Sequence, residues 1–137
     1  MNFASDNTAP LAPEVMAAIT GRDDPMAAAR ELVRLGVRDL AVVHFPAGCV
    51  AAAADGRTWR QAAVRVPKAE IRSTNGAGDA FASGVMLGLH EGMPVERCLV
   101  QGVCVAAVSL TALGPSAGIR PLAACLDYGE QHGFGSA

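Results

Sequence analysis

An excess of charge of one sign is absent from this chain of 137 residues, whose formal net charge is -2 at pH 7. Binding to nucleic acid or to an acidic membrane usually relies on a strongly basic protein surface, so neither partner is expected. A zinc-binding pattern is also absent, because the cysteines form no C-x-x-C pair and no histidine follows at zinc-finger spacing. We therefore expect reduced, mostly buried thiols in a cytoplasmic protein, at Cys49, Cys98, Cys104 and Cys125.

Two further patterns are missing, a secretory signal and a membrane span. Residues 1–6 (MNFASD) contain neither a basic segment nor an apolar one, so no signal peptide is predicted. Residues 98–119 carry no charge, but Gly114 and Pro115 would end a helix within them. The remainder is shorter than the roughly 20 apolar residues that cross a bilayer and contains Gln101, so we expect a helix buried in a soluble core.

Helical and strand patterns alternate along the chain, which predicts a single α/β domain with enough apolar residues (51%) to form a core. The apolar run 40–43 is typical of a buried parallel strand, and Asp55-Gly56 predicts a hairpin turn between two further strands. The strands are expected at 40–43, 49–54 and 58–66, and the helices at 13–20, 25–35, 79–90, 94–113 and from about 121. Residues 133–137 have the composition of a frayed tail.

A glycine-rich turn directly precedes one of these helices, at residues 73–81 (STNGAGDAF). The backbone amides of Gly76, Ala77 and Gly78 have little side chain around them and can converge on an anion, assisted by the positive end of the helix dipole. Asp79 lies in the first turn of the predicted helix and would face whatever is bound there. The pattern therefore suggests a phosphate site with Asp79 as its base.

Two other phosphate-binding motifs do not fit this turn. A dinucleotide fingerprint would need a third glycine where Phe81 stands, and a Walker A loop would need a lysine that does not follow. Asn75-Gly76 is also a common turn dipeptide. The residues alone leave two interpretations open, a phosphate-binding turn and a purely structural one.

Residues 74–81 followed by Gly84 resemble the C-terminal signature of the ribokinase-like carbohydrate kinases of the phosphofructokinase-B type. Residues 13–21, 36–56 and 94–114 resemble further segments of that family, so the resemblance covers nearly the whole chain. It implies a ribokinase-like α/β fold, present in part: residues 1–137 would form one partial domain, the C-terminal portion of a three-layer α/β/α sheet with a β-hairpin.

The resemblance also implies an activity, transfer of the ATP γ-phosphate to an alcohol group of a sugar or nucleoside. Asp79 would accept the proton of that alcohol, while the amides of Gly76, Ala77 and Gly78 would form an anion hole. ATP and Mg²⁺ are the implied cofactors, and Glu14 is implied to act indirectly on the metal. The residues implied to lie at the nucleotide are Gly48, Asn75, Gly78, Val103 and Gly114.

The chain departs from the family pattern at several places. Ser73 replaces an aspartate associated there with a monovalent cation, and Leu11 replaces the asparagine of the Asn-x-x-Glu motif. The nucleotide loop reads HFPAG at 44–48, where Pro46 removes an amide donor. The family is also considerably longer, and its sugar-binding half is not matched. A second hypothesis is therefore a catalytically silent remnant or binding module. Three accounts of the short length stay open: a truncated gene product, a start assigned at an internal methionine, or a half that pairs with a second copy or with an N-terminal half.

Overall fold

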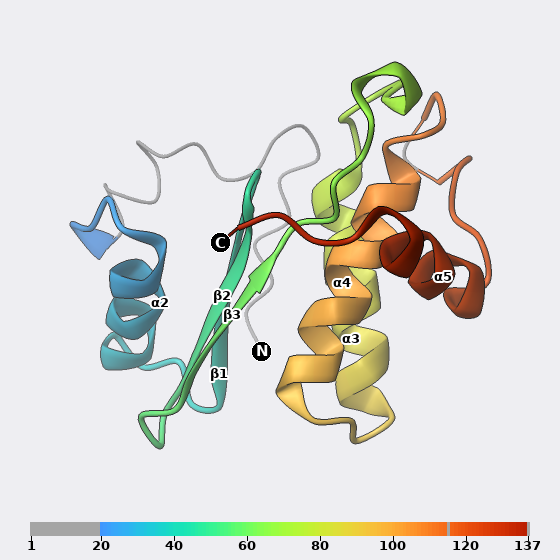
Figure 1. Ribbon diagram of the computed structural model, residues 1–137. Helices are drawn as coiled ribbons and strands as arrows, with labels where there is room; N and C mark the ends of the chain where they lie inside the picture. Colours follow the sequence, from blue (N-terminus) through green and yellow to red (C-terminus); the bar gives the residue numbers. More distant parts are fainter. Residues whose placement is uncertain (1–19, 115, 137) are drawn as a thin grey trace.

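The computed structural model describes residues 20–114 and 116–136, which form three layers (Figure 1). A single helix covers one face of a three-stranded sheet, and three helices cover the other face. In chain order the elements are α2 (Pro25–Arg34), β1 (Leu40–Phe45), β2 (Gly48–Ala53), β3 (Thr58–Ala62), the short 3-10 helix η1 (Lys68–Glu70), α3 (Ala77–His90), α4 (Val95–Ser109) and α5 (Leu122–His132). The expected helix at 13–20 lies almost entirely outside the described residues.

The sheet has the order β1-β2-β3, and both strand pairs are antiparallel. The parallel strand predicted at 40–43 is therefore wrong, because β1 pairs with β2 through a tight turn at Pro46 and Ala47. Such a short connection joins antiparallel strands, whereas parallel strands need a long crossover. The apolar run was misleading because this sheet is covered on both faces, which makes its strands apolar whatever their direction.

The predicted hairpin between β2 and β3 is confirmed. Gly56 has a φ of 90°, in the left-handed region that glycine adopts at little cost, and its amide donates to Ala53 O at a distance of 3.0 Å. Ala53 N also donates to Arg57 O at a distance of 2.9 Å, so the turn closes the ladder between the two strands.

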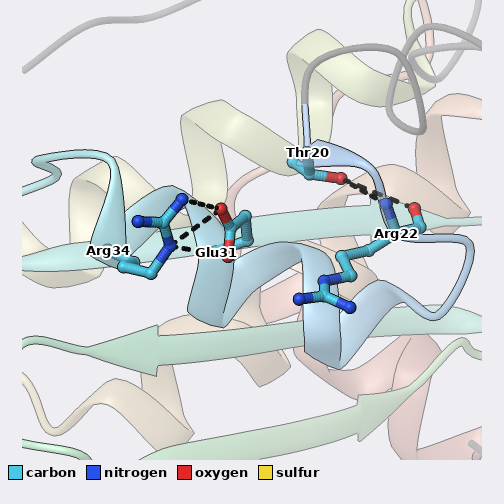
Figure 2. A network of polar contacts seen from close by, with 4 residues as sticks. All are labelled: Thr20, Arg22, Glu31 and Arg34. Atoms are coloured by element: carbon cyan, nitrogen blue, oxygen red, sulfur yellow. Dashed lines mark hydrogen bonds and ion pairs between the residues drawn. The ribbon is translucent and has the colours of Figure 1, made fainter.

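Helix α2 has the ends that its sequence predicts. Asp24 accepts from Ala27 N at 2.7 Å as the N-cap, and Pro25 occupies the first helical position. On the outer face the Arg34 guanidinium contacts the Glu31 carboxylate (Figure 2), but the Arg34 side chain is 70% exposed, so this pair adds little stability. The inner face packs on the sheet, with Met26 and Ala29 among β1 and β2 residues.

Helices α3 and α4 lie against each other at very short range. An added Cβ at Gly84 would lie 2.9 Å from Gln101 O, and one at Gly102 would lie 2.7 Å from both Phe81 Cε2 and Val85 Cγ2. A larger residue at Gly84 would require the helices to separate, and one at Gly102 would require either that or a shift of the Phe81 and Val85 side chains. Both helices were predicted, although α3 begins two residues earlier than expected and α4 ends four residues earlier.

The C-terminal residues 133–136 are not a frayed tail. Arg65 N donates to Gly133 O and Gly135 N donates to Ala63 O, each at a distance of 2.9 Å. Val64 forms an isolated antiparallel β-bridge with Phe134. The strand predicted at 58–66 is shorter in the structure, because β3 ends at Ala62. Residues 63–65 pair instead with residues 133–135. The four cysteines are buried and form no disulfide, as predicted. Within the described ranges, each helix is too short or too polar to reach across a bilayer.

Candidate active site

The glycine-rich turn is the N-terminal end of α3. Gly76 is the N-cap with φ 82° and ψ 0°, a left-handed conformation that favours glycine over any other residue. Asn75 N donates to Ser73 Oγ at a distance of 3.1 Å, and Ala80 N donates to Gly76 O at 2.9 Å. The sequence therefore turns sharply at Gly76 and enters the helix at Ala77.

The backbone at this helix start is accessible at Gly78. The first amides of a helix have no acceptor within the helix, and the helix dipole favours an anion beside them. Ala77 N makes only a long bond of 3.4 Å to Thr74 O. Gly78 is exposed, and a Cβ added to it would have no described atom within 4 Å. The space beside Gly78 suits a group that approaches the backbone closely.

Asp79 lies in the first turn of α3 and is half-buried. Its backbone oxygen accepts from Ser83 Oγ at 2.8 Å. The helix that carries it is fixed against α4 through Gly84 and Gly102, so the carboxyl group is placed by packed secondary structure. The predicted base and the predicted anion-hole residues thus occupy four consecutive positions at one rigid helix end.

The C-terminal end of α4 lies beside this turn. Leu110 O accepts from Arg72 N at 2.8 Å and from Ser73 N at 3.3 Å. Gly114, with φ 110°, follows in the segment after α4. Figure 1 shows the start of α3 and the end of α4 at the same end of the helix pair. The turn and the Gly114 segment, far apart in the sequence, therefore belong to one end of the molecule.

The segment predicted as a nucleotide loop approaches α3 through an aromatic pair. The rings of His44 and Phe81 stack with centroids 4.3 Å apart and an interplanar angle of 9°. Burial lowers the pKa of His44 to about 4, so the ring is neutral at pH 7. The stack joins the end of β1 to a residue two positions after Asp79. Sequence reasoning missed this contact because two aromatic residues 37 positions apart leave no spacing signal.

Two predicted nucleotide residues have structural roles of their own. Gly48 is buried with φ 153°, and an added Cβ would collide with Gln61 O and lie 2.9 Å from Ala62 Cα. Val103 is only 2% exposed, within the core between the sheet and the helices. The described residues therefore give the Val103 side chain no surface for a nucleotide. Glu14 and Leu11 lie outside them.

The comparisons with known proteins bear on this helix end directly. A family model described as pfkB family carbohydrate kinase matches residues 13–121, which include the whole turn and both helices of the pair. This chain belongs to the pfkB family of carbohydrate kinases. The resemblance carried by residues 74–84 is thereby confirmed.

Individual pfkB relatives agree with this assignment. The chain is 35% identical over 114 residues to an acarbose 7(IV)-phosphotransferase of Actinoplanes sp., covering 82% of this chain and 38% of that protein. It is 49% identical over 47 residues to the adenosine kinase of Saccharomyces cerevisiae, covering 34% of this chain and 14% of the kinase. The chain thus spans well under half the length of the curated relatives it matches.

Solved structures show the same fold. The Arabidopsis thaliana ribokinase complexed with ribose and ATP superposes with a TM-score of 0.72 at 19% identity, over 86% of this chain and 39% of that one. The ribokinase of Thermotoga maritima gives 0.70 at 22% identity, over 84% and 39%. The predicted fold class is confirmed: the described residues form part of a ribokinase-like α/β fold.

The start of α3 fits a phosphate group better than it fits a metal bound by protein alone. The open space beside Gly78 and the amides at the start of α3 are suited to phosphate oxygens. Among residues 20–114 and 116–136, no three His, Cys, Asp or Glu side chains gather where they could hold a metal ion. Mg²⁺ is commonly held by one or two carboxylates together with substrate phosphates, and Asp79 is the carboxylate at this helix end.

Proposed function

We propose that this chain is the nucleotide-binding and catalytic portion of an ATP-dependent kinase that phosphorylates an alcohol group of a sugar or nucleoside. The observation that carries the proposal is the pairing of Asp79 with the amides at the start of α3, where the space beside Gly78 is open. The relatives support the acceptor class, since their names include an acarbose phosphotransferase, a 5-dehydro-2-deoxygluconokinase and adenosine kinases.

In the proposed reaction the acceptor oxygen attacks the γ-phosphorus, its proton passes to the Asp79 carboxylate, and the bond to the ADP oxygen breaks. The amides of Gly76, Ala77 and Gly78 stabilise the charge that develops on the transferred group. Mg²⁺, when bound to the phosphates, neutralises part of their charge. Asn75, Gly48 and Gly114 are proposed to border the nucleotide, and Glu14 to act on the metal indirectly.

The acceptor site needs polypeptide beyond this chain, because the chain spans only 38% of the acarbose phosphotransferase. We propose that an N-terminal half or a second copy supplies it. Large apolar side chains are exposed at Met86, Leu113 and Ile119, where such a partner could pack. The buried reduced cysteines are consistent with a cytoplasmic location.

The partial coverage also favours a second candidate, a catalytically silent pfkB remnant that keeps the fold and binds nucleotide without turnover. The burial of Val103 and the packing role of Gly48 reduce the surface on which a nucleotide could be held. The two candidates differ in phosphoryl transfer and share ATP binding, which makes transfer the deciding measurement.

The test uses a chimera in which this chain replaces the aligned 114-residue stretch of the acarbose phosphotransferase, so that the relative supplies the acceptor site. We expect the chimera to transfer phosphate from ATP, whereas the 137-residue chain alone transfers little. Asp79→Asn should lower kcat by about three orders of magnitude because proton acceptance is lost. Calorimetry should find its affinity for ATP nearly unchanged.

The matched control is Asp127→Asn, which makes the same change at an exposed position of α5 and should leave kcat unchanged. Near-normal turnover of Asp79→Asn would show that Asp79 is not the base. ATP binding by a chimera that transfers no phosphate would favour the silent remnant. Absence of ATP binding would contradict both candidates.

A further inference from the structure

Three side chains form a cluster between α5 and the segment that leads to the catalytic turn. Tyr128, only 7% exposed, donates its hydroxyl to Glu70 Oε2 at 2.8 Å. His132 lies one turn further along α5, stacks on Tyr128 with centroids 4.1 Å apart, and places Nε2 at 3.6 Å from Glu70 Oε1. Both oxygens of Glu70 therefore face α5, although the residues are about 60 positions apart in the sequence.

The partners of Glu70 are well suited to hold it. Burial and the neighbouring carboxylate raise the pKa of Tyr128 to about 12, so its hydroxyl remains a donor at neutral pH. His132 Nδ1 lies 3.0 Å from Tyr128 O, which fixes the ring on its own helix. A hydrogen bond to a charged acceptor is stronger than one between neutral groups.

Apart from the contacts of Glu70 with α5, residues 67–75 are attached to the rest of the fold mainly by bonds to Leu110, at the C-terminal end of α4. From residue 67 to residue 75 no residue is buried, and only Glu70 and Ser73 are half-buried. Helix η1 has no side-chain cap and buries nothing. Burial in the core therefore cannot fix the course of this segment, and its hydrogen bonds must do so.

Glu70 is followed in the chain by residues whose bonds lead to the turn. Arg72 N and Ser73 N donate to Leu110 O, and Ser73 Oγ accepts from Asn75 N, the residue before the N-cap Gly76. If the Glu70 end of this segment is released, the bonds to Leu110 must hold the entry to the turn alone. The backbone amides that follow would then sample more conformations.

We propose that Glu70 is a positioning residue for the catalytic turn, held by Tyr128 and His132 of α5, so that α5 controls the geometry of the amides at the start of α3. The proposal rests on the proposed kinase function of that turn. Phosphoryl transfer depends mainly on positioning, so a small displacement of these amides lowers turnover more than it lowers nucleotide affinity.

The first experiment measures amide hydrogen exchange in the full 137-residue chain and does not depend on catalysis. Glu70→Ala should raise the exchange rates of the hydrogen-bonded amides of Arg72, Ser73 and Asn75 by about tenfold, the expected loss of one charge-assisted hydrogen bond, and leave the α4 core unchanged. Tyr128→Phe keeps the stacked ring and should show a smaller increase at the same amides. Glu70→Gln keeps an acceptor for Tyr128 and should restore most of the protection.

Two results of this experiment would overturn the proposal. In one, Glu70→Ala leaves the amides of Arg72, Ser73 and Asn75 within about twofold of the wild-type rates, so the cluster does not restrain the turn. In the other, exchange rises uniformly over the molecule, which would indicate a general contribution to stability. Denaturant unfolding of each variant, measured in parallel, separates the local effect from the global one.

The second experiment measures turnover in the chimera described above. Glu70→Ala should lower kcat about tenfold with little change in the KM for ATP, and Glu70→Gln should recover most of kcat. Unchanged kcat beside increased exchange would overturn the positioning role. If the unsubstituted chimera transfers no phosphate, the kinase function fails, and the exchange result still decides whether α5 restrains the turn.

Discussion

Gly78 is a position where the chain itself does not require glycine. Its φ lies outside the left-handed region, and an added Cβ would meet no described atom within 4 Å. Alanine is the better helix former, so stability alone would favour alanine at this position. A group outside the described residues gives the simplest reason for glycine, since a phosphate that contacts the backbone would occupy the space of the Cβ.

Gly78→Ala should therefore have opposite effects on stability and on activity. The free energy of unfolding should stay the same or rise by up to about 1 kcal/mol, because the helix gains a better former. Turnover in the chimera should fall about tenfold or more, because the methyl group displaces the transferred phosphate. Denaturant unfolding and steady-state kinetics check the two halves, and unchanged turnover would exclude a close approach of phosphate at Gly78.

At the scale of the elements, the contact between α3 and α4 decides where Asp79 lies. The two helices approach through glycines on both sides, Gly84 and Gly88 on α3 and Gly102 on α4. The atoms nearest to an added Cβ differ in how easily they can move. Gly84 faces the backbone oxygen of Gln101, which cannot move without its helix, whereas Gly102 faces the side chains of Phe81 and Val85.

Gly102→Ala should therefore lower the free energy of unfolding by about 1–3 kcal/mol, the usual cost of overpacking a core. Its methyl group would lie 2.7 Å from Phe81 and Val85, so α3 must shift or the two side chains must leave their rotamers. Denaturant unfolding measures the loss. Gly78→Ala is the matched control, because the same methyl group enters open space there. Equal stabilities of the two variants would contradict this account of the helix contact.

At the scale of the whole molecule, the sequence predicted the features that depend on local chemistry. The caps of α2, the turn at Asp55-Gly56 and the helical runs of α3, α4 and α5 each have a local signal, and each is confirmed. Strand direction was wrong because a sheet covered on both faces gives the same apolar run in either direction.

The candidate site likewise combines residues that a local motif predicts with contacts that no local pattern predicts. Asp79 and Gly76–Gly78 are consecutive in the sequence, so one motif was sufficient to find them together. The contacts that support them join distant residues: His44 with Phe81, Leu110 with Arg72, and Glu70 with Tyr128. No spacing rule connects such pairs, because only the three-layer packing brings them together. The core position of Val103 depends on the same packing.

The burial of His44 makes the stability of the whole molecule depend on pH. Burial lowers the pKa of His44 from 6.5 to about 4, so between these values the unfolded chain binds a proton that the folded chain does not. Stability should therefore be highest above about pH 6.5 and decrease as the pH falls towards 4, with a contribution of about 1–3 kcal/mol from this half-buried ring.

Denaturant unfolding between pH 4 and pH 7 measures this dependence, with His44→Phe as the matched variant. Phenylalanine keeps an aromatic ring against Phe81 and has no group that titrates, so the free energy of unfolding of the variant should change less with pH. Other groups also contribute to the pH dependence, among them Glu31 and Asp55, whose hydrogen bonds to Arg34 and Arg57 hold the pKa of each carboxyl below its usual value. Because they are present in both proteins, the difference between the two curves isolates His44. Parallel curves would show that the ring between β1 and α3 takes up its proton as readily in the folded chain as in the unfolded one.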